Sequence, residues 1–176
     1  GKLKKNTAVG TVMTNMGFSK FCEANGIDFV STKVGDRYVL ESMLQNGYNI
    51  GGEQSGHIIF LDHSTTGDGE LSGAMLLSIM KRTGEKLSDL AKIMERYPQV
   101  LINVKVSNEG KLSFYTDKEV KAEINRVTEI LGDTGRILVR VSGTEPLVRV
   151  MVEGENLEQI QTLAEEAAQV VRERLA

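Results

Sequence analysis

Several residue types are scarce or absent in this sequence. It has no tryptophan, one cysteine and two prolines among 176 residues. One cysteine excludes an internal disulfide, and Cys22 follows Phe21 in an apolar helical pattern, which predicts a buried thiol in a reducing compartment. No hydrophobic run is long enough to cross a bilayer, and Lys2, Lys4 and Lys5 lack the apolar stretch of a signal peptide. We therefore expect a cytoplasmic protein with no membrane contact and these lysines on a solvated strand edge.

An excess of positive charge is also missing. The formal net charge is -3, from 21 basic and 24 acidic side chains. Binding to a phosphate backbone depends on an accumulated excess of Lys and Arg, and single strands also need aromatic platforms for stacking. With 5% aromatic residues, the sequence offers few such platforms. These absences argue against nucleic acid as a partner.

The sequence does contain an unusual segment, RVSGTEPLVR, from Arg140 to Arg149. Apolar residues alternate before it and continue after it, so the pattern predicts a β-hairpin with the Ser-Gly-Thr turn at its tip. Across such a hairpin the two arginines lie nearly opposite each other. Two like charges at that spacing destabilise a sheet unless an anion or a carboxylate neutralises them.

The residues of this turn support two interpretations. Ser142, Gly143 and Thr144 offer hydroxyls and backbone N–H groups, which together with two guanidinium groups suit a phosphate dianion. Alternatively, Glu145 neutralises the arginines, and the hairpin is an ordinary surface element. We expect a phosphate-binding turn, with the salt-bridged hairpin as the alternative.

A second segment, GGEQSGH, from Gly51 to His57, precedes an apolar strand. On an extended segment Glu53, Ser55 and His57 project from one side, and these groups suit sugar hydroxyls. His57 is also a candidate for moving a proton near neutral pH. A glycine-rich turn whose polar side chains only cap the neighbouring backbone is the alternative.

Together these two segments resemble the α-D-phosphohexomutases, and within them the bacterial phosphoglucosamine mutases. The similarity extends to the stretches TVMTN (11–15) and TKVGDR (32–37). It implies that Glu53, Ser55 and His57 bind the sugar, with His57 as a candidate catalytic residue. Gly35 and Asp36 fall near another substrate-binding loop. The residues that the resemblance assigns to the phosphate-binding loop are Arg140, Ser142, Gly143, Thr144 and Arg149.

The resemblance also implies an activity that needs residues not found in this sequence. Such enzymes interconvert glucosamine 6-phosphate and glucosamine 1-phosphate for amino-sugar nucleotide and cell-wall synthesis. They use a phosphoserine, Mg²⁺ and a glucose or glucosamine 1,6-bisphosphate that serves as activator and intermediate. The phosphoserine and magnesium motifs are absent here. We therefore expect the third and fourth domains of such an enzyme, monomeric and inactive without the N-terminal catalytic half.

Other functions remain open at this stage. A phosphomannomutase or phosphoglucomutase half is the nearest alternative, because only a few positions favour the amino sugar. A freestanding phosphosugar-binding module without catalysis and a purely structural domain are the others.

The order of periodic segments predicts two domains. Residues 1–96 follow a β-α-β-α-β order, which predicts a three-layer α/β/α domain with a mainly parallel sheet. Residues 97–176 follow a β-α-β-β-α order, which predicts a smaller α+β domain with helices on one face of an open sheet. Pro98 breaks the pattern between them and is a candidate hinge.

Local signals predict helix ends and core positions. The polar stretch 62–70 has no metal-site spacing, and we expect Asp68 to cap a helix and no metal to bind. Thr116 and Glu119 form the pattern of a capping box. A short helix is expected from Ser88 to Met94. The positions expected to face a core include Leu40, Met43 and Leu44, then Leu71, Ala74, Met75 and Leu77, then Val120, Ile124, Val127 and Leu131, and finally Leu157, Ile160, Ala164, Ala167, Val171 and Leu175.

Overall fold

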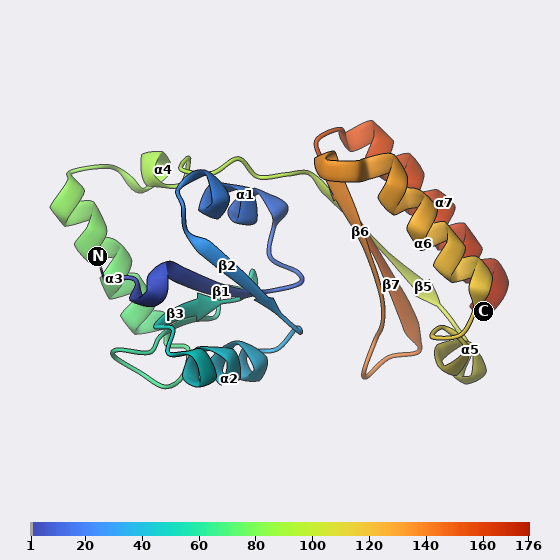
Figure 1. Cartoon of the computed structure of the whole chain (residues 1–176), viewed down its shortest axis with the longest axis horizontal. Helices are drawn as coiled ribbons and strands as arrows, with labels where there is room; N and C mark the ends of the chain where they lie inside the picture. The colour runs from blue at the N-terminus through green and yellow to red at the C-terminus, as the bar shows by residue number, and fades with distance from the viewer. Residues whose placement is uncertain (1) are drawn as a thin grey trace. The chain divides into compact units, whose positions relative to one another are not determined.

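A computed structural model describes residues 2–176. The chain forms two compact units, the first ending at Arg96 and the second spanning Tyr97–Ala176. Figure 1 labels the elements of each. Each unit has its own sheet and its own helices, so the two are described in turn.

The first unit is built on a four-stranded sheet in the order β2-β1-β3-β4. The first three strands are parallel and β4 runs antiparallel to β3. This mainly parallel α/β arrangement confirms the fold class expected from the sequence. The strands are β1 (Thr7–Thr11), β2 (Asp28–Thr32), β3 (Ile50–Gly52) and β4 (Ile58–Phe60), and the helices are α1 (Met16–Ala24), α2 (Asp36–Asn46), α3 (Gly69–Thr83) and α4 (Leu87–Leu90).

One buried cluster joins α2 to the sheet. Val39 and Met43 on α2 pack against Val9 and Ile59 on the strands, and all four side chains are at most 3% exposed. Gly51 on β3 lies directly beneath this helix, where a Cβ would come within 2.7 Å of both Val39 and Met43. The absence of a side chain there lets α2 approach the sheet closely.

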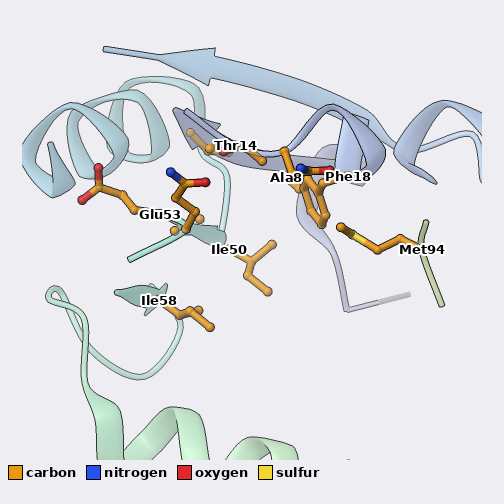
Figure 2. A pocket seen from close by; sticks show the side chains of 13 residues that line it. Ala8, Thr14, Phe18, Ile50, Glu53, Ile58 and Met94 are labelled. Atoms are coloured by element: carbon orange, nitrogen blue, oxygen red, sulfur yellow. The ribbon is translucent and has the colours of Figure 1, made fainter. Parts of the chain in front are cut away.

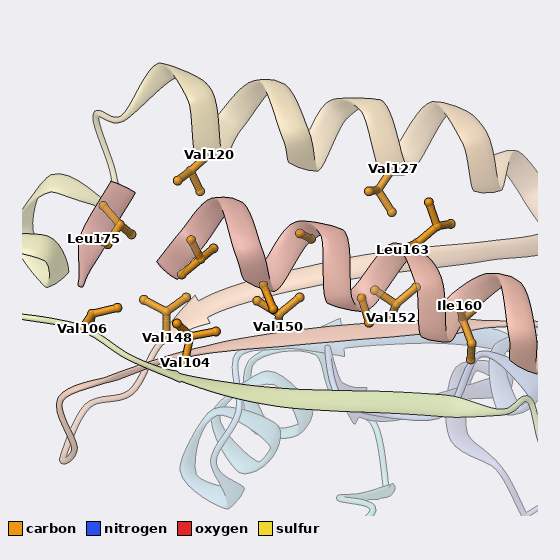
Figure 3. Close-up of a cluster of buried hydrophobic side chains, with 14 of the residues drawn as sticks. Val104, Val106, Val120, Val127, Val148, Val150, Val152, Ile160, Leu163 and Leu175 are labelled. Atoms are coloured by element: carbon orange, nitrogen blue, oxygen red, sulfur yellow. The ribbon is translucent and has the colours of Figure 1, made fainter. Parts of the chain in front are cut away.

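The second unit is an antiparallel sheet in the order β5-β7-β6. Its long helices pack on one face of the sheet, where valines of β5 and β7 meet side chains of both helices (Figure 3). This confirms the expected α+β arrangement. The strands are β5 (Gln99–Lys105), β6 (Gly135–Val141) and β7 (Leu147–Gly154), and the helices are α5 (Asn108–Ser113), α6 (Lys118–Leu131) and α7 (Leu157–Leu175); 3-10 turns span Lys4–Asn6 in the first unit and Gly132–Thr134 in this one.

About half of the expected core positions are buried, and they lie mainly on α6 and α7. Ile160, Ala164, Ala167, Val171 and Leu175 of α7 are at most 2% exposed, as are Val120, Val127 and Leu131 of α6. Leu40, Leu71, Met75 and Ile124 are half-buried, and Leu44, Ala74, Leu77 and Leu157 are exposed. The apolar face expected on α3 was wrong, since that helix has no buried residue. Cys22 is buried as expected, and burial raises the pKa of its thiol.

Several local predictions were wrong. Asp117, not Thr116, caps α6: its carboxylate accepts the N–H of Val120 at 2.9 Å. An aspartate carboxylate offers the stronger acceptor one residue later, so the helix starts there. Lys4 and Lys5 lie in a 3-10 turn and not on a strand edge.

Other element boundaries also differ from the prediction. The helix expected from Ser88 to Met94 is only the single turn α4. A further short helix, α5, follows β5 and was not predicted. Within residues 2–176, no helix combines the length and the apolar composition needed to span a membrane.

Candidate functional site

The hairpin between β6 and β7 places Arg140 directly opposite Arg149 in the strand register. Alternate residues of these strands enter the helix-covered core, so both arginines lie on the other face of the sheet. Burial and the neighbouring charge of Arg149 hold the pKa of the Arg140 guanidinium below its usual range. The predicted juxtaposition of two like charges is therefore present.

The two arginines differ in their partners. Arg149 donates to the Glu145 carboxylate at 2.8 Å, so Glu145 neutralises one of the two arginines, as the alternative interpretation of the hairpin has it. Arg140 forms no ion pair with any residue among 2–176. The Nε of Arg149 is buried and has no hydrogen-bond partner in the described structure. The one carboxylate at this pair thus neutralises Arg149 alone, and hydrogen-bond donors of the guanidinium groups stay unused.

The turn itself is shaped by Ser142. Its side chain is 3% exposed, its Oγ accepts the N–H of Glu145 at 3.3 Å, and its own N–H donates to the Leu147 carbonyl at 2.8 Å. Gly143 and Thr144 lie exposed at the tip, and a Cβ at Gly143 would meet nothing within 4 Å. Ser142 therefore builds the turn, while the next two residues are the ones that an anion can reach.

Sequence reasoning missed two polar residues near this turn. The Lys111 ammonium donates to the Glu145 carbonyl at 3.0 Å, which brings a third cation to the turn. Asn103 on β5 pairs in register with Arg149 on β7, which in turn pairs with Arg140 on β6. The exposed amide of Asn103 therefore lies beside the two arginines across the sheet. Both come from segments far away in sequence, and no local pattern marks them.

The segment 53–57 of the first unit is a tight turn, not the extended stretch that was predicted. The N–H of Glu53 donates to the His57 carbonyl at 2.9 Å and that of Gly56 to the Glu53 carbonyl at 3.0 Å. Gly56 has a φ of 94°, which favours glycine. Because β3 and β4 must reverse direction here, the chain closes a hairpin, and Ser55 lies exposed at its tip.

The turn contacts the start of α2. One carboxylate oxygen of Glu53 accepts the N–H of Gly35 at 2.9 Å. The Nε2 of His57 lies 3.5 Å from a carboxylate oxygen of Asp36. The structure therefore brings together Gly35, Asp36, Glu53 and His57, four of the five residues assigned to the sugar-binding region, at the edge where the parallel strands end.

A pocket of about 350 Å³ lies beside this turn, between α1 and the sheet (Figure 2). Its walls are largely apolar. Two of its polar side chains are already engaged: Asn15 accepts the Gly17 N–H at 3.0 Å and Glu53 accepts the N–H of Gly35. A sugar needs free polar partners, so the exposed turn suits it better than this pocket. The other residues that line it are Ala8, Val9, Gly10, Thr14, Phe18, Ile50, Gly51, Gly52, Gln54, Ile58 and Met94.

The polar segment before α3 contains Asp, His and Glu side chains, which are possible metal ligands. The Asp68 carboxylate accepts the Leu71 N–H at 2.9 Å and caps this helix, as expected. Among residues 2–176 no group of three His, Cys, Asp or Glu side chains is arranged to hold a metal ion. The described part of the chain therefore offers no fit for Mg²⁺.

Two family models match the chain. The model for phosphoglucomutase/phosphomannomutase, alpha/beta/alpha domain III, matches residues 1–97, and the model for the C-terminal domain of the same enzymes matches residues 101–170. The chain belongs to the phosphoglucomutase/phosphomannomutase family. The resemblance noted in the sequence is confirmed, and the two matched regions correspond to the two compact units of the structure.

Similar proteins include several bacterial phosphoglucosamine mutases. The chain is 55% identical over 175 residues to that of Caldanaerobacter subterraneus subsp. tengcongensis, which covers 99% of the chain. It is 54% identical to that of Acetivibrio thermocellus over the same length. The chain spans 39% of the length of each of these relatives.

Solved structures share the fold at lower identity. A structure of the Aspergillus fumigatus N-acetylphosphoglucosamine mutase matches with a TM-score of 0.84 at 20% identity, over 98% of this chain and 39% of that one. A structure of the same fungal enzyme in complex with GlcNAc-6P and magnesium matches with a TM-score of 0.82 at 18% identity, over 100% of this chain and 40% of that one.

Proposed function

We propose that this chain provides the sugar-binding and phosphate-binding elements of a phosphoglucosamine mutase. That enzyme would interconvert glucosamine 6-phosphate and glucosamine 1-phosphate through a phosphoserine and a 1,6-bisphosphate. The observation that supports this most directly is the facing pair Arg140 and Arg149, of which only Arg149 is paired with a carboxylate, that of Glu145. A phosphate dianion would neutralise the charge that Glu145 leaves over.

The hairpin would hold the phosphate that is not reacting. Its two guanidinium groups supply charge, and the exposed backbone at Gly143 and Thr144 allows close approach of N–H donors. Ser142 would act mainly through the shape of the turn, because its hydroxyl is buried. Since a mutase must accept its substrate in two orientations, a turn that recognises only phosphate serves both.

The turn at 53–57 would bind sugar hydroxyls. Glu53 has one carboxylate oxygen engaged with Gly35 and retains further acceptor capacity. Ser55 is exposed and can donate or accept. His57 carries the imidazole of this turn, and imidazole is the side-chain group most often used to move a proton, so His57 is the candidate for that role. Gly35 and Asp36 would support these groups from the start of α2.

The reactive groups of the proposed enzyme would lie outside this sequence. The fungal relative binds GlcNAc-6P and magnesium in one structure, and a variant of it binds glucose 1,6-bisphosphate in another. The described part of this chain has no fit for magnesium, so no step is assigned to a metal held here. The role of this chain is binding, orientation and proton transfer.

A chimaeric enzyme tests this proposal. This chain replaces the 175 aligned residues of the Caldanaerobacter phosphoglucosamine mutase. The chimaera should convert glucosamine phosphate, and it should prefer glucosamine over glucose and mannose phosphates assayed side by side. A folded but inactive chimaera would favour a non-catalytic binding module. A preference for mannose or glucose phosphate would favour the corresponding hexose mutase.

A further inference from the structure

The imidazole of His57 rests against Gly67, a residue just before α3. A Cβ built at Gly67 would lie within 2.5 Å of Nε2, Cε1 and Cδ2, so it would overlap the face of the ring. The backbone of Gly67 is not in the positive-φ region, so its conformation alone does not demand glycine. The histidine ring is therefore what excludes a side chain at this position.

Asp36 approaches Nε2 of this ring from α2. Its carboxylate lies 3.5 Å from Nε2, beyond the 2.7–3.2 Å range of a well-formed hydrogen bond. Nε2 is buried and has no hydrogen-bond partner in the described structure, although the ion pair with Asp36 is within range. The carboxylate therefore acts chiefly through its charge, which favours a proton on Nε2.

The other ring nitrogen has different surroundings. The side chain of His57 is 34% exposed even though Nε2 is buried. Nδ1 is not among the buried polar atoms without a partner and forms no hydrogen bond in the described structure, so it is the ring nitrogen that solvent reaches. In a neutral imidazole with its proton on Nε2, the lone pair is on Nδ1.

We propose that Gly67 and Asp36 are positioning residues that fix His57 with Nε2–H inward and Nδ1 outward. This rests on the proposed function of His57 in proton transfer. Nδ1 would take the proton of the attacking sugar hydroxyl as its oxygen bonds to the phosphorus of the phosphoserine. The bond between that phosphorus and the serine oxygen breaks, and its electron pair stays on that oxygen. In the reverse direction Nδ1–H returns the proton.

The chain contains two histidines, so nitrogen NMR of ¹⁵N-histidine can resolve each ring. His63→Gln assigns the His57 resonances. In the neutral ring we expect the pattern of the Nε2–H tautomer. Asp36→Asn should shift it toward a mixture of tautomers, and Gly67→Ala should displace the ring and change both nitrogen resonances. Gly69→Ala is the matched control, because a Cβ there meets nothing within 4 Å.

Two results would overturn the inference. One is an Nδ1–H tautomer in the unmodified chain, and the other is a His57 spectrum that Gly67→Ala and Asp36→Asn leave unchanged. Asp36 is 59% exposed, so its variant tests the inference even where Gly67→Ala fails to fold. The measurement needs no phosphosugar. Failure of glucosamine 6-phosphate binding would therefore contradict the proposed function, and the wrong tautomer would contradict the positioning role alone.

Discussion

Arg140 on β6 faces Arg149 on β7 across the hairpin, and Arg149 alone of the two holds a carboxylate. Facing cations in a sheet repel each other, so this arrangement costs stability in the absence of a counter-ion. A site that binds an anion benefits from the same arrangement. Removal of one arginine should therefore lower the affinity for an anion and, without ligand, leave the free energy of unfolding equal or raise it.

Arg140→Ala tests this opposition. Loss of a charge-assisted contact of roughly 1.5–3 kcal/mol should weaken phosphate binding by about 10- to 100-fold. Without ligand, the free energy of unfolding should stay equal or rise, because the repulsion from Arg149 is gone. Phosphate titration and urea unfolding measure the two quantities. Arg126→Ala on α6 is the control, and equal phosphate affinity in both variants would contradict the assignment.

Glu145→Gln should strengthen anion binding. It removes the carboxylate that competes for Arg149 while keeping a side chain of similar size. An exposed ion pair contributes roughly 0.2–1 kcal/mol, so affinity for inorganic phosphate should rise by about 1.4- to 5-fold. Isothermal titration with Glu109→Gln as the matched control measures this. Weaker binding in Glu145→Gln would mean that the carboxylate supports the turn more than it competes with the ligand.

Two helix glycines of the first unit should respond oppositely to alanine. A Cβ at Gly17 on α1 would overlap the Glu95 carbonyl, so Gly17→Ala should destabilise by about 1–3 kcal/mol. A Cβ at Gly73 on α3 meets nothing within 4 Å, so Gly73→Ala should stabilise by about 0.5–1 kcal/mol. Urea unfolding followed by circular dichroism compares them. Equal effects would show that segment 91–96 does not pack on α1 as described.

Alkaline pH should weaken the first unit through Cys22. Burial raises the pKa of this thiol in the folded chain, so the folded state holds its proton to higher pH than the unfolded state does. The contribution of the protonated thiol to the free energy of unfolding is complete below the pKa of the unfolded state, about 8.5. It is lost as the pH rises through the pKa of the folded state. Unfolding free energies across this range should fall more steeply for the unmodified chain than for Cys22→Ala. Parallel curves would contradict the prediction.

The sequence was most informative where contacts are local. The alternation of apolar residues on both sides of a Ser-Gly-Thr turn was sufficient to predict the hairpin and the facing arginines, because strand register follows from the turn. Asp68 was predictable as a cap for the same reason, because its carboxylate accepts an N–H three residues along the chain.

Contacts between distant segments were not predictable. Lys111 reaches Glu145 across 34 residues and Arg149 aligns with Asn103 through β-sheet pairing. The turn at 53–57 was misread as extended because glycine allows both conformations, and only the antiparallel β4 decides between them. The contact between the His57 ring and Gly67 likewise depends on the path of the chain between β4 and α3.

The central claim is that this chain carries a phosphate-binding hairpin in its second unit and a sugar-binding turn at 53–57 in its first. Titration of the ¹⁵N-labelled chain with glucosamine 6-phosphate, followed by NMR, tests it most directly. The account predicts saturable shifts at the amides of Gly143 and Thr144, at the Arg140 and Arg149 side chains, and at residues 53–57. Arg140→Ala should raise the ligand concentration needed for the hairpin shifts by about 10- to 100-fold. Inorganic phosphate should reproduce the hairpin shifts without changing the resonances of residues 53–57. Shifts confined to other surfaces, or none at millimolar ligand, would contradict the account.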